Sequence, residues 1–340
     1  MPQHRPDLDR FAMVLMLVLC TVWGLQQVAI KVANAGISPI WQAGLRSIGA
    51  TVLVWAWASV RGVKLWTPDG TLAPGLLAGL LFGGEFALIF WGLEYTSASR
   101  GIIFLYTAPF FVALGAVWLL PHEHMRRAQW TGMALAFCGV VALFGENLLR
   151  PAGRAWIGDL MMFVAAAMWA ATTLTIKASR LARVAAEKTL LYQLAVSAVV
   201  LPPLALAFGE PGVFAPSAAV WTSLAFQVVI VASASYVAWF WLISRYPATR
   251  LSSFSFLTPV MGVLAGALLL GETLTLAVLL ALTLVGAGIW LANRPTPAGV
   301  ADAAVVGGAR SAQTAQTAQT AQTARAAQSA KAAKAEGRDA

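Results

Sequence analysis

The sequence predicts an all-α membrane protein whose ten transmembrane helices form two inverted five-helix repeats. Three observations predict this fold class: an apolar composition, ten apolar runs of helical length, and an internal duplication. Of the 340 residues, 59% are hydrophobic and 11% are charged, and the mean hydropathy is +0.74. A water-soluble core could not hide this much apolar surface, so the chain is expected to cross a membrane several times.

Each expected helix is a run of roughly 20 mostly apolar residues, the length that crosses a hydrocarbon layer of ~30 Å. An open sheet is excluded at that depth because each unpaired backbone group in lipid costs several kcal/mol, and the alternating pattern of a barrel is missing. In chain order, the expected helices lie near residues 11–31, 38–60, 74–93, 98–120, 130–146, 156–177, 188–208, 219–243, 251–271 and 275–293.

The apolar runs are related to one another, because two stretches of the first half recur in the second. WGLQQVAIK (23–31) and WAATTLTIK (169–177) place a tryptophan, a polar pair and a lysine at identical spacing, 146 residues apart. Residues 90–120 also align without gaps on residues 240–270, with nine identities. The similar offsets of the two correspondences indicate a duplication of the whole half.

The duplication defines two repeats, residues 11–149 and 156–293, with five expected helices each. Because five is odd, the second repeat must enter the membrane from the opposite side. Inverted repeats of this kind allow one bundle to present a central site alternately to the two sides of a membrane. Residues 1–10 precede the bundle. Residues 295–340, with four consecutive AQT triplets, have no apolar face and are expected to form a disordered tail.

The net charge of +9 indicates membrane topology rather than nucleic-acid binding, because of where the cations lie. If the N-terminus is cytoplasmic, thirteen cations fall on the inner side and four on the outer side, a clear positive-inside bias. Both termini are therefore expected in the cytoplasm. The inner cations are Arg5, Arg10, Arg61, Lys64, Arg126, Arg127, Lys177, Arg180, Arg183, Lys188, Arg245, Arg250 and Arg294; the outer ones are Lys31, Arg100, Arg150 and Arg154.

The first apolar run also has features of a secretory signal. Arg5 and Arg10 precede it, and an A-x-A sequence follows at 33–35. The duplication favours a retained helix instead, since this segment has a counterpart at 156–177.

Several spaced features together resemble a known family. They are WGLQQVAIK in the first helix, Arg46 in the second, EYTSASRGIIFLYTAP (94–109), Gly158-Asp159, and LTPVMGVLAGALLLGE (257–272). Over residues 11–293 the chain resembles the EamA-type branch of the drug/metabolite transporter superfamily. The resemblance implies ten helices in two repeats, a carrier mechanism, and commonly the export of small metabolites across the bacterial inner membrane.

Arg46 and Glu85 are the charged residues of interest deep in the expected helices. Arg46 lies eight residues inside its helix, roughly 12 Å deep at 1.5 Å per residue, and Glu85 lies at a similar depth on the next helix. An unpaired charge there costs at least ~2.5 kcal/mol, so each needs a partner, water or substrate. Two readings stay open. The residues form a static ion pair, or Arg46 anchors a substrate carboxylate and Glu85 is linked to a proton. Gln193 is the expected neutral counterpart of Arg46.

The two repeated motifs place polar side chains on one helical stripe, because residues three to four apart share a face. One reading is structural: the amides and hydroxyls bond neighbouring helices, and the lysines reach the membrane interface. The other reading assigns the polar pairs to substrate and the lysines to a gate or helix end. The residues concerned are Trp23, Gln26, Gln27 and Lys31, and Trp169, Thr172, Thr173 and Lys177.

Pro109 and Pro259 fall in the middle of two expected helices, where a missing N–H and a ring clash predict kinks that shape a pocket. Asp159 lies three residues into its expected helix, which favours a capping role, while the Gly158-Asp159 motif that it shares with the resembled family leaves a functional role open. The His122-Glu123-His124 cluster has no further convergent ligands, so no metal site and no cofactor are expected.

The expected substrate site combines aromatic faces, neutral hydrogen-bonding groups and one deep cation, which suits a compact amphiphile with a carboxylate, such as an amino-acid-like metabolite. The alternatives are an importer or facilitator of another solute (cationic drug, sugar or nucleotide-sugar) and a membrane scaffold. No enzyme chemistry is expected. The expected partners are the small solute and the lipid bilayer, with a proton as candidate coupling ion. The site residues are Trp23, Gln26, Gln27, Arg46, Trp91, Tyr106, Trp169, Thr172, Thr173, Gln193, Ser235 and Trp239.

Overall fold

The computed structural model describes residues 8–92, 95–96, 98–120, 125–145, 153–270 and 276–293. Within these ranges, only the backbone is described for residues 27, 31, 98–99, 265–267, 269–270 and 277. The expected tail at 295–340 and the His122 to His124 cluster lie outside the described residues.

The described part of the chain is helical, and its only strand-like pairing is an isolated bridge between Ile37 and Val213. The helices of the first half are α1 (Arg10–Asn34), α2 (Pro39–Val60), α3 (Leu72–Gly92), α4 (Ala98–Leu105), α5 (Ala108–Leu119) and α6 (Arg127–Phe144). The helices of the second half are α8 (Ala155–Ala178), η1 (Arg180–Arg183), α9 (Ala186–Ala207), α10 (Ala218–Phe226), η2 (Gln227–Ser235), α11 (Tyr236–Arg245), α12 (Ala248–Phe254), α13 (Leu257–Leu270) and α14 (Leu276–Ala292).

Within the described ranges, eight helical segments are long and apolar enough to cross a membrane, and Val278–Ala292 of α14 is a shorter apolar helix. The expected span at 251–271 corresponds to part of α12 and all of α13, which are too short to qualify singly. The all-helical, multi-pass character is therefore observed, whereas the count of ten spans remains a prediction.

Local signals set the helix starts. Asp9 caps α1, because its carboxylate accepts the backbone N–H of Ala12 at 2.8 Å. Pro39 occupies the first turn of α2, where its missing N–H costs nothing. The Glu210 carboxylate accepts the free N–H groups of Ile40 (3.1 Å) and Trp41 (3.0 Å) at that same helix end. The loop after α9 is thereby fastened to the start of α2.

Two expected helices are divided in two immediately before a proline. A turn at residues 106–107 separates α4 from α5, and a turn at 255–256 separates α12 from α13. Pro109 and Pro259 lie in the first turns of α5 and α13, where proline is tolerated. The expectation of kinks at these prolines is thus met by full helix breaks at equivalent positions of the two repeats.

The span expected as one helix at 219–243 contains a π-helical segment. It runs as α10, η2 and α11, with the nine residues Gln227–Ser235 in π geometry. The Ser233 hydroxyl donates to the carbonyl of Val228, five residues earlier, at 2.7 Å. π segments widen a helix locally and occur often beside functional sites.

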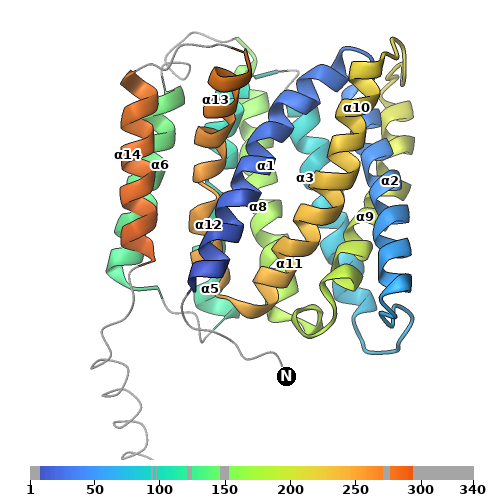
Figure 1. Cartoon of the computed structure of the whole chain (residues 1–340), viewed down its shortest axis with the longest axis horizontal. Helices are drawn as coiled ribbons and strands as arrows, with labels where there is room; N and C mark the ends of the chain where they lie inside the picture. Colours follow the sequence, from blue (N-terminus) through green and yellow to red (C-terminus); the bar gives the residue numbers. More distant parts are fainter. Residues whose placement is uncertain are drawn as a thin grey trace, which may run out of the picture. The chain divides into compact units, whose positions relative to one another are not determined.

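Small residues allow close packing between helices. On α3, a Cβ at Gly79 would lie 2.7 Å from the Val196 side chain of α9, and a Cβ at Gly24 of α1 would lie 2.6 Å from the backbone nitrogen of Gly262 on α13. Gly79 therefore allows α3 to pack closely on α9. Figure 1 shows α6 and α14, the last helix of each half, side by side at one edge of the bundle.

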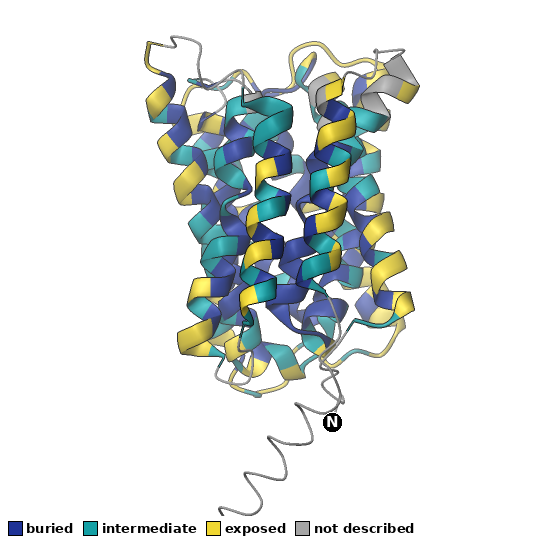
Figure 2. Cartoon of the chain, turned by 90° about the vertical axis from the view of Figure 1, so that its left-hand side faces the viewer, coloured by how far each residue is buried: buried dark blue, intermediate teal, exposed yellow. Residues whose placement is uncertain are grey.

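The outer faces of the bundle are apolar. Figure 2 shows exposed positions recurring along the helices around a buried interior. Many of these positions carry large hydrophobic side chains, including Val52 on α2, Leu80 on α3, Leu114 on α5 and Val199 on α9. A soluble protein rarely exposes such a continuous apolar surface, so this surface fits contact with lipid chains.

Candidate functional site

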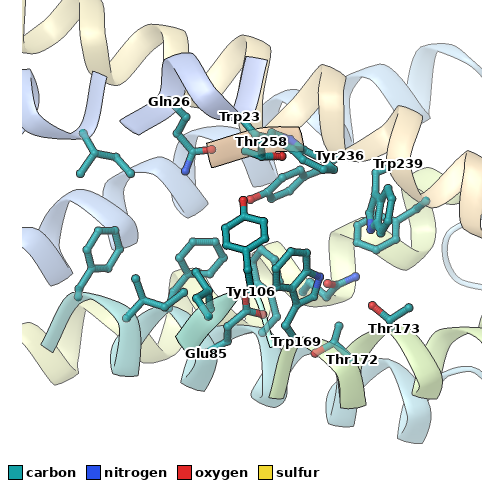
Figure 3. Close-up of a pocket in the computed structure, with 18 residues that line it drawn as sticks. Trp23, Gln26, Glu85, Tyr106, Trp169, Thr172, Thr173, Tyr236, Trp239 and Thr258 are labelled. Carbon is teal, nitrogen blue, oxygen red and sulfur yellow. The ribbon is translucent and has the colours of Figure 1, made fainter. Parts of the chain in front are cut away.

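A cavity of about 160 Å³ lies between the two halves of the bundle. Side chains from α1, α3, the α4–α5 junction, α8, α9, α11 and α13 line it, so both repeats contribute (Figure 3). The lining residues are Trp23, Gln26, Ile30, Phe82, Glu85, Phe86, Ile89, Phe90, Leu105, Tyr106, Trp169, Thr172, Thr173, Gln193, Tyr236, Trp239, Phe240 and Thr258.

Aromatic rings from facing helices meet in this cavity. Trp23 of α1 packs edge-on against Trp239 of α11, with ring centroids 5.5 Å apart, and Tyr106 packs edge-on against Trp169 of α8 at 6.0 Å. The indole N–H of Trp23 donates to the hydroxyl of Ser235 at 2.9 Å. Ser235 does not line the cavity itself but fixes the orientation of a tryptophan that does. Edge-to-face pairs of this kind favour one relative orientation of the aromatic rings that form the cavity wall.

Neutral polar groups are spaced around the cavity. Gln26 comes from α1, Thr172 and Thr173 come from α8, and Gln193 comes from α9. The Thr172 hydroxyl donates to its own helix at Met168 O (2.9 Å), which leaves its oxygen able to accept another bond. Gln193 donates to Thr189 O at 3.2 Å, while its Oε1 atom has no hydrogen-bond partner in the described part of the chain. These groups offer hydrogen bonds to a solute.

Arg46 and Glu85 are placed differently from one another. Glu85 lines the cavity, whereas Arg46 does not and is only 1% exposed. The guanidinium of Arg46 lies over the Phe86 ring, 4.2 Å from its centroid, and Phe86 lines the cavity. Among the described residues no ion pair joins Arg46 to Glu85, so the expected contact of these two charges is not present in this conformation.

The remaining expected residues divide into three groups. Trp91 is 36% exposed at the end of α3 and packs on Phe208, the residue that follows α9 (4.5 Å between ring centroids), away from the cavity. Pro109 and Pro259 belong to the helix breaks beside the cavity residues Tyr106 and Thr258. The side chains of Gln27 and Lys31 lie outside the described part of the structure.

Lys177 ends α8 and contacts the end of another helix. Its ammonium group donates to the carbonyls of Ile243 (2.9 Å) and Tyr246 (2.5 Å), at the C-terminus of α11. Helix C-termini carry unpaired carbonyls and partial negative charge, so the lysine caps α11. The Tyr246 hydroxyl in turn donates to Asp9 Oδ2 at 2.9 Å, which connects this cluster to the start of α1.

At the opposite end of α8, Asp159 forms an ion pair with Arg100 and accepts the Thr96 hydroxyl at 2.7 Å. The capping role expected for Asp159 is therefore wrong, because α8 begins at Ala155, no acidic residue lies in its first turn, and the Asp159 carboxylate bonds Arg100 and Thr96 instead. The ion pair connects α4 to α8, and the Thr96 bond connects the segment between α3 and α4 to α8, so both join the two repeats at this bundle end.

Sequence reasoning missed several aromatic lining residues. Phe82, Phe86 and Phe90 recur every four residues on α3, so they share a face with Glu85. This spacing of aromatic residues around a deep carboxylate could have identified them as lining residues. Tyr236 and Phe240 follow the π segment η2. A π segment changes which residues share a helix face, and the periodicity of the sequence does not reveal that change.

Metal binding has no structural support within the described ranges, where no three His, Cys, Asp or Glu side chains come together.

Comparisons with known proteins give a family, related proteins and a shared fold. The profile of the EamA-like transporter family matches residues 10–145 and 156–294. A relative from Salmonella typhimurium, a "probable amino-acid metabolite efflux pump", is 30% identical over 288 residues, which cover 82% of this chain and 93% of the relative. The "uncharacterized transporter YoaV" of Bacillus subtilis is 26% identical over 79% of this chain and 92% of its own length. A solved crystal structure with 21% identity shares the fold, with a TM-score of 0.72 over 82% of this chain and 95% of that one.

Proposed function

Because the chain belongs to the EamA-like transporter family, we propose that it is a secondary-active carrier that exports a small amino-acid-like metabolite across the bacterial inner membrane. The family match confirms the resemblance read from the sequence, and transporters of this family are not enzymes. The substrate, the direction and the mechanism are the parts that we propose.

The observation that carries the proposal is the central cavity built by both repeats. Seven helical regions, drawn from residues 11–149 and 156–293, contribute lining side chains. A site at the interface of two inverted repeats can face either side of the membrane as the halves exchange conformations. We therefore propose alternating access by ten spans, five in each repeat, with both termini in the cytoplasm, as the positive-inside bias favours.

The chemistry of the cavity supports an amine-bearing amphiphile. Glu85 is the only carboxyl among the described residues that line it, and the aromatic rings of Trp23, Trp169 and Trp239 surround the same space. An ammonium group gains from a carboxylate and from ring faces, and apolar walls cover the rest of a compact solute. A substrate carboxylate would be received by hydroxyl and amide groups such as Thr172 and Gln193 rather than by Arg46, which lies behind Phe86.

Glu85 also supports proton coupling. A carboxyl group inside the membrane can hold a proton or face a substrate amine, but one group cannot serve both at once. If the two compete for Glu85, a proton entering from outside displaces the amine to that side, which gives proton-driven export. The relative named as an amino-acid metabolite efflux pump supports this direction.

The test is counterflow and pH-driven transport in proteoliposomes made with the purified chain. We expect exchange of amino-acid-like amines, and we expect Glu85→Gln to abolish accumulation driven by a proton gradient. Glu187→Gln is the matched control, because Glu187 lies in the first turn of α9, outside the cavity. Its transport should equal that of the native chain.

Three outcomes would contradict parts of the proposal. Unchanged pH-driven transport in Glu85→Gln would remove the proton role. Exchange of nucleotide-sugars, with no response to any amino-acid-like compound, would show that the substrate class is wrong. If exchange is confined to organic cations without a carboxylate, Glu85 still binds the cationic group, but the substrate is a cationic drug-like solute rather than the proposed metabolite.

A further inference from the structure

A second hollow lies at the surface of the bundle. It is a groove of about 500 Å³ between the end of α2, the loop at 61–71, the start of α3 and the start of α9, and it shares no lining residue with the central cavity. Trp66 is 91% exposed and Trp55 is 52% exposed, so the groove opens outward. Its apolar walls include Trp55, Leu65, Trp66, Leu72, Leu76 and Leu191.

The polar floor of this groove is balanced in charge. The Lys188 ammonium group, 4% exposed, donates to Asp69 Oδ2 at 2.7 Å and to Thr67 Oγ1 at 3.2 Å. Lys188 and the Thr71 hydroxyl hold the pKa of the Asp69 carboxyl well below its usual range. The Asp69 carboxylate therefore stays ionised at neutral pH, and its bond to Lys188 fixes the loop on α9. It leaves no spare positive charge inside the groove itself.

Positive charge gathers in the adjoining hollow, a basic pocket of about 440 Å³. Lys177, Arg180 and Arg183 line it, together with Pro74 at the start of α3. Arg180 and Arg183 are exposed, and none of the lining residues is acidic. A pocket of this composition attracts an anion.

Gly70 joins the two hollows, because it lines both. Its φ of +71° is a conformation that favours glycine. A Cβ at this position would lie 2.5 Å from Nη1 of Arg180, which also donates to Asp69 O at 3.3 Å. The absence of a side chain thus lets the Arg180 guanidinium cross the loop at the boundary between the apolar groove and the basic pocket.

We propose that these two hollows form one site for an anionic phospholipid. The phosphate occupies the basic pocket at Arg180 and Arg183, and an acyl chain occupies the apolar groove. Exposed tryptophans such as Trp66 are typical of the boundary between lipid chains and headgroups, and basic pockets at the ends of membrane helices bind anionic headgroups. A soluble phosphate compound would gain nothing from the adjoining apolar walls, so the pairing of hollows favours a lipid.

The proposal can be tested on the purified full chain by native mass spectrometry. The protein is titrated with phosphatidylglycerol and, separately, with phosphatidylcholine of the same acyl chains, and the bound lipid is counted. We expect the native chain to prefer phosphatidylglycerol, and we expect the double variant Arg180→Gln, Arg183→Gln to bind it about tenfold more weakly. Arg127→Gln is the control, since Arg127 is an exposed cation at the start of α6.

A second variant tests the apolar half without touching a charge. Ala195→Phe fills the groove beside Tyr192 and should weaken binding of both lipids, while thermal unfolding in detergent verifies that the variant is folded. Equal binding of the two lipids by the native chain, or undiminished phosphatidylglycerol binding in the double variant, overturns the proposal. Displacement of the bound lipid by equimolar glycerol 3-phosphate would assign the basic pocket to a soluble phosphate instead.

Discussion

Arg46 is a buried cation whose Nε and Nη1 atoms have no hydrogen-bond partner among the described residues. Its stacking on Phe86 offsets part of the cost of burial, since a desolvated cation over a ring contributes about 2 kcal/mol. A charge left with so few partners in one conformation is suited to gain partners in another. We therefore expect Arg46 to matter for the transport cycle more than for the fold.

We predict that Arg46→Met changes the free energy of unfolding by less than about 2 kcal/mol but lowers counterflow about tenfold. The loss of a poorly partnered buried charge compensates for the loss of the ring contact, whereas no apolar side chain can replace a cation during transport. Thermal unfolding in detergent and counterflow in proteoliposomes measure the two effects. Arg245→Met removes an exposed cation stacked on Trp241 (4.4 Å) and should alter neither. A loss of folded protein in Arg46→Met would assign Arg46 to the fold.

At this scale the sequence predicted part of the cavity. Trp23 and Gln26 were identified because helical spacing places them on one face, as were Thr172 and Thr173, and all four line the cavity. Depth alone could not separate Glu85 from Arg46. Both charges were expected at the same level, but which one faces the cavity depends on the rotation of α2 and α3 about their axes, and packing sets that rotation.

At the scale of elements, irregular backbone lies next to the cavity. The breaks before Pro109 and Pro259 place Tyr106 and Thr258 at the wall, and the π segment η2 directly precedes Tyr236. The prolines made the breaks predictable in position, because a proline cannot continue the hydrogen-bond ladder. The π segment carries no such residue, and only the surrounding helices stabilise it, so sequence could not reveal it.

The contact between α6 and α14 gives the sharpest prediction for an element. A Cβ at Gly288 would lie 2.5 Å from Ala136 N and from Gly132 O, whereas a Cβ at Gly286, two residues earlier on α14, would meet nothing within 4 Å. We expect Gly288→Ala to destabilise the protein by about 1–3 kcal/mol through overpacking. Gly286→Ala should be neutral or slightly stabilising. Thermal unfolding of the two variants in one detergent checks this, and equal effects would contradict a close approach of α14 to α6 at Gly288.

At the scale of the whole molecule, two halves of similar sequence build one bundle. The apolar composition predicted a helical membrane protein, and the spaced motifs predicted the family, which the profile match confirms. The number of spans and the sidedness of the bundle rest on hydropathy and charge. Those properties fix which segments prefer lipid more firmly than they fix which loop faces which compartment.

Sidedness has a direct test by cysteine labelling in a variant whose exposed Cys138 is replaced by serine, with the buried Cys20 retained. We expect Ala218→Cys, at the exposed start of α10, to react with an impermeant maleimide added outside intact cells. Arg183→Cys should react only after the membrane is opened, because the cation-rich ends are expected in the cytoplasm. The reverse pattern would invert the orientation of the bundle.

The α6–α14 contact also bears on how such a protein can change over evolutionary time. None of the residues that line the central cavity belongs to either helix. Assembly of the two halves thus depends partly on a seam that lies outside the cavity lining among the described residues. Because proteins tolerate new mutations only while they keep enough stability, a robust seam outside the recognition surface leaves the aromatic and polar positions of the cavity free to diverge. One scaffold can in this way give rise to descendants with different solutes while the joint between its halves stays the same.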